Sequence, residues 1–144
     1  MGALDLGVKV AEPRLKAVCY VEREAYAAAT LVARMEEQAL DRAPIWSDLK
    51  SFPSEQFTGA EMLIGGIPCQ PYSAAGKQKG ARDERDLWNA TLRILQDTGA
   101  QGLFLENVAR FIRHEDGLLR ALEDLNQLGL NAVWGTFSCS GLGS

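Results

Sequence analysis

Short apolar runs alternate along this chain with longer stretches of helical spacing, and this alternation is the strongest constraint on its fold. Strand patterns lie at 16–22, 60–68, 101–108 and 130–138, with a short strand or turn at 43–50 and helical patterns at 24–40, 84–99 and 115–129. Strands that alternate with helices build a mostly parallel sheet covered on both faces. The sequence therefore predicts an α/β fold, with Gly99 and Gly129 ending the last two helices.

Four residues with reactive or charged side chains fall where the predicted strands end. They are Glu22, Asp48, Cys69 and Glu106. In a parallel sheet the ligand binds outside the carboxyl ends of the strands. We therefore expect these four side chains on one edge of the sheet.

Composition limits the classes of protein to which the chain can belong. Its 144 residues fit one domain, and a net charge of −4 with a pI of about 5.0 argues against a free-standing nucleic-acid binder. A catalytic part held on DNA by other segments stays possible. No apolar run approaches the roughly 20 residues of a membrane helix. The three tryptophans are expected in the core: Trp46, Trp88 and Trp134.

The cysteines also exclude two kinds of site. Cys19, Cys69 and Cys139 are an odd set without a Cys-x-x-Cys pair. This pattern predicts neither a disulfide framework nor a zinc site. A reducing, cytoplasmic location fits it best, and no metal is expected.

Cys69 has the most unusual surroundings of the three cysteines. Pro68 stiffens the backbone before it, and Gly76 and Gly80 occur in the polar segment that follows. Basic residues in that segment favour a thiolate and can meet phosphate; they are Lys77, Lys79, Arg82 and Arg85. The alternative is a buried cysteine that packs as a small apolar side chain.

Glu106 and Glu22 each have two interpretations, whereas Asp48 has one. Glu106 either caps a helix or pairs with Arg110, or, beside a nucleophilic cysteine, it holds a proton for a substrate ring nitrogen. Glu22 is either a solvated charge or an acid that binds ribose hydroxyls. Asp48 is expected to be a turn or helix-cap residue.

Four stretches of the sequence occur in the order of the motifs of a known enzyme family. They are YVEREAYAAATL at 20–31, IWSDLK at 45–50, GGIPCQPYSAAGKQKGARDERDLW at 65–88 and FLENV at 104–108. The third resembles the Pro-Cys-Gln catalytic loop of the C5-cytosine-specific DNA methyltransferases, and the fourth resembles their Glu-Asn-Val motif. The first two resemble the second and third motifs of that family.

The resemblance implies a Rossmann-like fold that uses S-adenosylmethionine, and a role in DNA methylation of the restriction–modification kind. Cys69 would attack C6 of a flipped cytosine and form a covalent adduct, while Glu106 would hold the base at N3. The resemblance also implies the cofactor-binding residues Glu22, Asp48, Leu49, Pro68 and Leu87. Gln70 and Ser73 match family positions near DNA.

The sequence departs from the family pattern at both ends. MGALDLG resembles the tail of the first motif, without its strand and Phe-x-Gly-x-Gly turn, and no Gln-x-Arg-x-Arg motif or target recognition domain follows. We therefore expect residues 1–144 to be a partial catalytic domain, a fragment or split subunit. Its sheet would have a gap between the strands at 17–22 and 60–67, filled by a complementary subunit or by self-association.

Two other interpretations stay open. One is a non-catalytic remnant or regulatory binding module derived from the same family. The other is an unrelated enzyme that uses a thiol.

Overall fold

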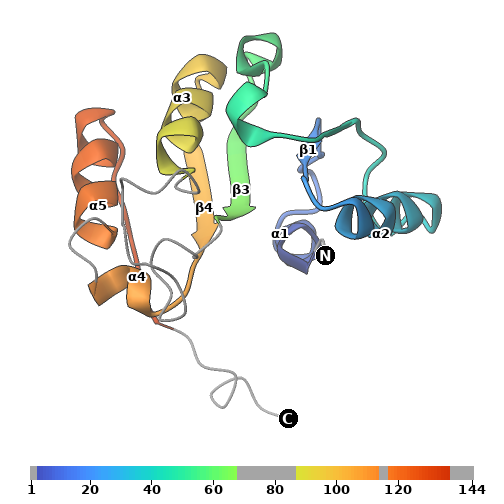
Figure 1. Ribbon diagram of the computed structural model, residues 1–144, viewed down its shortest axis with the longest axis horizontal. Coiled ribbons are helices and arrows are strands. Elements are labelled where there is room, and N and C mark those ends of the chain that lie inside the picture. The colour runs from blue at the N-terminus through green and yellow to red at the C-terminus, as the bar shows by residue number, and fades with distance from the viewer. Residues whose placement is uncertain (1–2, 68–86, 114–116, 137–144) are drawn as a thin grey trace. The chain divides into compact units, whose positions relative to one another are not determined.

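The computed structural model describes residues 3–67, 87–113 and 117–136 (Figure 1). These residues divide into two compact units. The first comprises the described parts of 1–66 and 87–106, and the second comprises the described parts of 67–86 and 107–144.

The first unit carries the described strands, and the second is helical. In chain order the first unit contains α1 Ala3–Ala11, β1 Tyr20–Val21, α2 Ala25–Glu36, β2 Ile45–Trp46, the 3-10 turns η1 Leu49–Ser51 and η2 Ser54–Phe57, β3 Met62–Gly66, α3 Trp88–Thr98 and β4 Gly102–Glu106. The second contains α4 Arg110–Arg113 and α5 Leu118–Gln127. None of the described helices is both long enough and apolar enough to span a bilayer.

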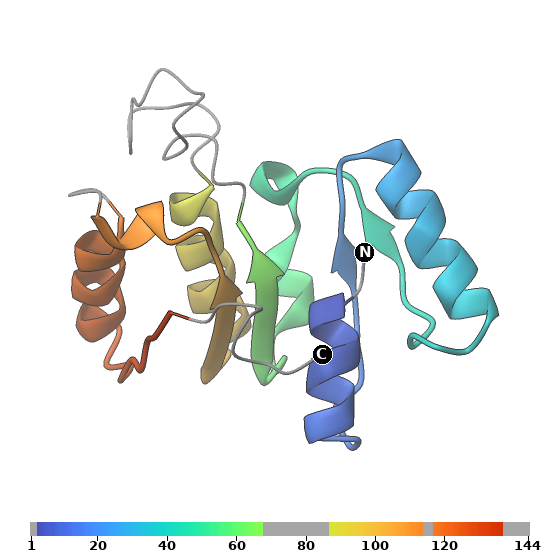
Figure 2. The same cartoon turned by 90° about the horizontal axis from the view of Figure 1, so that it is seen from below.

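The strands pair in parallel, as the alternation predicts. β1 pairs with β2, with Val21 opposite Trp46, and β3 pairs with β4, with Gly66 opposite Glu106. In Figure 2 the arrows of β2, β3 and β4 point to the same side. The carboxyl ends of both pairs therefore face one edge of the first unit.

The two pairs are separate sheets in the described part of the chain. The amides of Tyr20 and Glu22 donate to the β2 segment, so the backbone groups of Val21 point to the other side of β1. Gly102 donates to the Glu61 carbonyl, so the backbone groups of Met62 face away from β4. The gap expected between β1 and β3 is thus present, because the facing edges of these two strands do not pair with each other.

A cavity of about 360 Å³ lies between these two strands. Residues 18–20 line one side, residues 59–62 and Ile64 line another, and α1 contributes Asp5, Val8 and Lys9. Figure 2 shows α1 running lengthwise along the strands, near β1 and β3. The facing edges of β1 and β3 therefore border this cavity.

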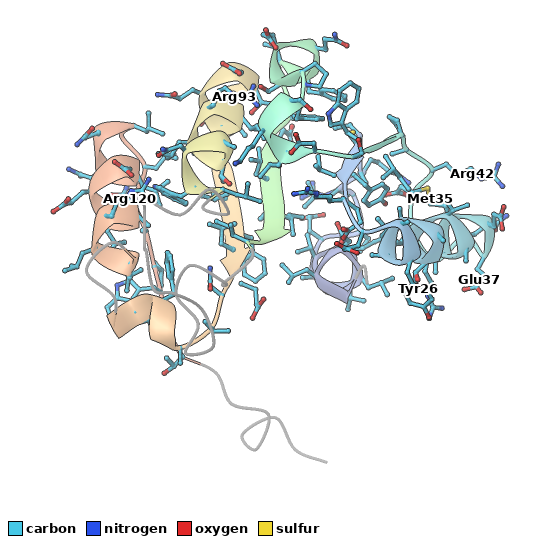
Figure 3. All side chains as sticks on the ribbon, in the orientation of Figure 1. Tyr26, Met35, Glu37, Arg42, Arg93 and Arg120 are labelled. Atoms are coloured by element: carbon cyan, nitrogen blue, oxygen red, sulfur yellow. The ribbon has the colours of Figure 1, made fainter. Side chains whose placement is uncertain are left out.

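The α2 helix buries one face because its apolar residues recur at helical spacing. Ala27, Leu31 and Met35 are buried, each four residues after the last. The last two join Tyr20 and Leu40 in a core cluster. In Figure 3 Met35 points inward, whereas Tyr26 and Glu37 point away from the helix toward solvent.

The glycine signals for helix ends are confirmed. Gly99 follows α3 with φ 70° and Gly129 lies beyond α5 with φ 74°. Glycine adopts this left-handed conformation without the steric penalty of a Cβ atom. These two turns therefore end their helices where the sequence predicts.

The strand predicted at 130–138 is wrong for the residues described. Residues 130–136 form no strand, and Val133 is fully exposed. A strand forms by pairing, and no described strand pairs with this segment. The core prediction for the tryptophans is also wrong for two of them: Trp88 is 3% exposed, but Trp46 and Trp134 are 41% and 57% exposed.

The α1 helix was not expected from the sequence. Leu4 and Val8 have helical spacing, but Gly7 between them lowers the helix propensity. Leu6 packs against the Tyr20 cluster, so tertiary contact outweighs the weak local preference.

Asp41 ties α1 to the segment that leads into β1. Its Oδ1 accepts from Lys9 Nζ at 2.8 Å and its Oδ2 accepts from the Ala17 amide at 3.1 Å. The Tyr20 hydroxyl donates to the Asp41 carbonyl at 3.1 Å. The bonds from Lys9 and Ala17 hold the pKa of the Asp41 carboxyl below its usual value.

Replacing Asp41 should give a pH-dependent loss of stability. Asp41→Asn should cost about 1–2 kcal/mol at pH 7, because an amide cannot replace a carboxylate that accepts two hydrogen bonds. A carboxylate whose pKa is lowered in the folded state stabilises the fold fully at any pH above its unfolded-state pKa of about 4. This stabilisation is lost as the pH falls through the folded-state pKa. Urea unfolding between pH 3 and pH 7 measures the difference.

The matched control is Glu37→Gln, since Glu37 pairs with Arg34 in an exposed ion pair. That change should cost less than about 0.5 kcal/mol. If the free energy of unfolding of Asp41→Asn differs from that of the unmodified chain by the same amount down to pH 3, the lowered pKa of Asp41 is contradicted.

Candidate cofactor and cytosine site

Two of the predicted carboxylates lie within two residues of the ends of neighbouring strands. Val21 and Trp46 are register partners, and the Glu22 amide donates to the Trp46 carbonyl at 2.9 Å. Glu22 comes next after β1, and Asp48 lies two residues after β2. Both are partly buried. The parallel pairing therefore brings Glu22 and Asp48 to the same edge of one sheet.

Glu22 is partly committed to the start of α2. Its Oε1 accepts from the Glu24 amide at 2.8 Å, next to the first turn of the helix. Among the described residues no hydrogen bond reaches the other carboxylate oxygen, Oε2. One oxygen of Glu22 thus shapes the backbone, and the second is left to accept from a ligand.

Asp48 has the geometry of the cap that the sequence allows. It precedes η1, and its Oδ1 accepts from the Lys50 amide at 3.1 Å. No described residue donates to Oδ2. Leu49, which begins η1, is partly buried. Asp48 therefore resembles Glu22, with one oxygen holding the local turn and one available.

The exposed indole of Trp46 lies close to this turn. Its Nε1 donates to Ser51 Oγ at 3.3 Å, and Ser51 Oγ donates in turn to the Asp48 carbonyl at 3.3 Å. Sequence reasoning placed this tryptophan in the core. Its position two residues before Asp48 was the only signal for its place at the site.

Glu106 lies at the carboxyl end of the second strand pair. It ends β4 opposite Gly66, and its side chain is exposed. A Cβ atom at Gly66 would lie 3.4 Å from Glu106 Oε2. The carboxylate therefore lies close to the end of β3, just before the segment that carries Cys69. The Arg110 side chain is outside the description, so its pairing with Glu106 stays open.

Of the five other predicted site residues, one lies in the part of the chain that the structure describes and four lie outside it. Leu87 is partly buried and precedes α3, where its carbonyl accepts from the Thr91 amide at 2.9 Å. Pro68, Cys69, Gln70 and Ser73 lie outside the described residues. The structure thus brings Glu22 together with Asp48, and Glu106 together with Gly66.

Cys19 is a poor candidate for the nucleophile. Its Sγ donates to the carbonyls of Tyr20 and Pro44, each at 3.4 Å. Burial raises the pKa of the Cys19 thiol, which lowers its thiolate fraction at neutral pH. Cys139 lies outside the described residues.

Glu22 and Asp48, at the first strand pair, offer carboxylate oxygens as hydrogen-bond acceptors. They suit a neutral or cationic ligand that carries hydroxyl and amino groups. Each of these two carboxylates has one oxygen to which no described residue donates, and the Trp46 side chain of the same strand pair is partly exposed. In the segments that the structure describes, no three side chains gather in a way that could hold a metal ion.

Comparisons with known proteins place the chain in a family. The family described as C-5 cytosine-specific DNA methylase matches residues 1–144. The Type II methyltransferase M.NgoMIV of Neisseria gonorrhoeae is 35% identical over 97 residues, which cover 63% of this chain and 31% of that protein. M.NaeI of Lentzea aerocolonigenes is 33% identical over 128 residues, covering 85% of this chain and 30% of the relative.

A third relative, the Type II methyltransferase M.HgiCI of Herpetosiphon aurantiacus, is 33% identical over 136 residues, which make up 30% of that protein. The chain therefore spans about a third of the length of these curated relatives. Because the family match extends over every residue, the chain belongs to the C-5 cytosine-specific DNA methylases.

Proposed function

We propose that this chain is the cofactor-binding and catalytic-loop part of a DNA (cytosine-5)-methyltransferase. The observation that carries the proposal is the parallel pairing of β1 with β2, which puts Glu22 and Asp48 at one edge. Two acceptors fixed there match the hydroxyl and amino groups of an adenosine. The membership of the family gives the reaction class.

The cofactor in this proposal is S-adenosylmethionine, which supplies an electrophilic methyl group when bound. Glu22 accepts from the ribose hydroxyls and Asp48 accepts from the adenine amino group. Leu49 and Leu87 line the adenine, and Pro68 lies at the methionine end. The free carboxylate oxygens of Glu22 and Asp48 support the first two roles.

Cys69 acts as the nucleophile on a cytosine that has left the duplex. Its thiolate forms a bond to C6, and electron density moves to C5, which then becomes nucleophilic. Glu106 holds a proton at N3 and stabilises the adduct. After methylation, loss of the C5 proton breaks the Cys69–C6 bond. Gln70 and Ser73 contact DNA near the vacated position.

The proposal also includes a strand that joins β1 to β3. Their unpaired edges border the cavity, and buried backbone groups without partners are costly. A complementary chain or a second copy supplies that strand and completes a Rossmann-like sheet. DNA is the other macromolecular partner.

A covalent trap tests the role of Cys69. With the remaining methyltransferase segments supplied, the chain should form a stable adduct with DNA that carries 5-fluorocytosine, because the fluorine cannot leave as a proton does. Cys69→Ser should abolish this adduct on a denaturing gel. Cys19→Ser and Cys139→Ser are the matched controls and should keep it. An adduct that survives Cys69→Ser would support the unrelated thiol enzyme instead.

The role of Glu106 predicts a loss of activity without a loss of fold. Glu106→Gln keeps the shape of an exposed side chain but cannot hold the proton at N3, so methyl transfer should fall about 100-fold or more. Radioactive methyl transfer and thermal unfolding measure the two quantities. An unfolded variant with unchanged specific activity would identify Glu106 as a structural residue.

Two variants of Glu22 separate its structural role from its role in binding. Glu22→Gln keeps an oxygen that can accept from the Glu24 amide, so stability should change by less than about 0.5 kcal/mol, while Glu22→Ala should lose about 1 kcal/mol. Both should weaken adenosine binding about tenfold or more, since neither carries the charge. Urea unfolding and NMR titration measure these effects. Unchanged adenosine affinity in Glu22→Gln would refute the ribose assignment.

A further inference from the structure

Arg93 reaches from α3 to the segment that follows Asp48 (Figure 3). Its Nη1 donates to the Phe52 carbonyl at 3.0 Å and to Ser54 Oγ at 2.7 Å. Its Nη2 donates to the carbonyls of Leu49 and Lys50, each at 3.3 Å. One guanidinium therefore gathers three backbone carbonyls and one hydroxyl.

A second residue of α3 strengthens this arrangement. Asp97, one helical turn beyond Arg93, accepts from Ser54 Oγ at 2.5 Å and pairs with Arg93 Nη1 at 3.4 Å. The Ser54 side chain is fully buried. Further along, the Gly59 amide donates to the Thr98 carbonyl at 2.9 Å. The α3 helix thus holds residues 49–59 along their whole length.

The arrangement bears directly on Asp48. Asp48 Oδ1 accepts from the Lys50 amide, and the carbonyl of the same peptide group, that of Leu49, accepts from Arg93. The Ser51 amide donates to the Asp48 carbonyl at 3.2 Å. A continuous series of hydrogen bonds therefore runs from the guanidinium to the Asp48 carboxylate. Hydrogen bonds from a charged donor are stronger than neutral ones, so the arginine dominates this series.

We propose that Arg93 is a positioning residue for the cofactor site, which fixes the turn that presents Asp48 to the adenine amino group. This inference rests on the proposed function, because it takes the adenine contact of Asp48 from there. Arg93 itself touches no ligand. Its planar fork reaches carbonyls that the single ammonium of a lysine cannot gather at once.

The experiment uses the full chain and compares Arg93→Lys and Arg93→Met with the control Arg34→Lys. Arg34 lies on α2 and pairs with Glu37 one turn on, at 2.9 Å, without contact to residues 48–54. NMR hydrogen exchange follows the amides of Lys50, Ser51 and Phe52, with Tyr20 and Glu22 as reference amides in the β1 segment. Adenosine is the probe for binding.

We expect both Arg93 variants to exchange about tenfold faster at residues 50–52, with the reference amides unchanged. Adenosine should shift the Lys50 amide resonance of the unmodified chain, and its affinity should fall about tenfold in the Arg93 variants. The Arg34→Lys chain should behave as the unmodified chain in both measurements.

Four results would overturn the inference. Unchanged exchange at residues 50–52, or adenosine binding as tight as in the unmodified chain, would show that Arg93 does not position Asp48. Unfolding of Arg93→Lys would show that the arginine holds the whole unit. If the unmodified chain fails to bind adenosine, the cofactor assignment itself fails, and this inference fails with it.

Discussion

The parallel pairing of two short strands is the constraint on which the candidate site depends. Because Val21 faces Trp46, the residues that follow β1 and β2 meet at one edge. Glu22 and Asp48 each use one carboxylate oxygen to hold a local turn, and no described residue donates to the other oxygen, to which we assign the ligand. Any shift of register would separate these two acceptors, so the short ladder matters more than its length suggests.

The supports of this edge come from distant parts of the sequence. Asp41 anchors the approach to β1 through Lys9 and Ala17, and Arg93 anchors the turn after β2 from α3. The other side of β1 faces a cavity instead of a strand. Among the described residues, β1 thus pairs with β2 on one edge and borders the cavity on the other.

Sequence reasoning could predict the features that depend on local pattern. The alanine-rich stretch at 24–40 predicted α2, the glycine at 99 predicted the end of α3, and the alternation of strands with helices predicted parallel pairing. It missed α1, where packing of Leu6 outweighs Gly7, and it placed Trp46 in the core. Arg93 could not be identified, because its partners lie some forty residues away in the chain.

The identity of the methylated base tests the central claim most directly. DNA from cells that express this chain together with the remaining methyltransferase segments is digested to nucleosides and analysed by mass spectrometry. In the proposed mechanism the cysteine and the carboxyl at N3 direct methylation to carbon, so 5-methylcytosine should appear and should vanish with Cys69→Ser. Methylation at cytosine N4 or adenine N6, or 5-methylcytosine that persists without Cys69, would contradict the account.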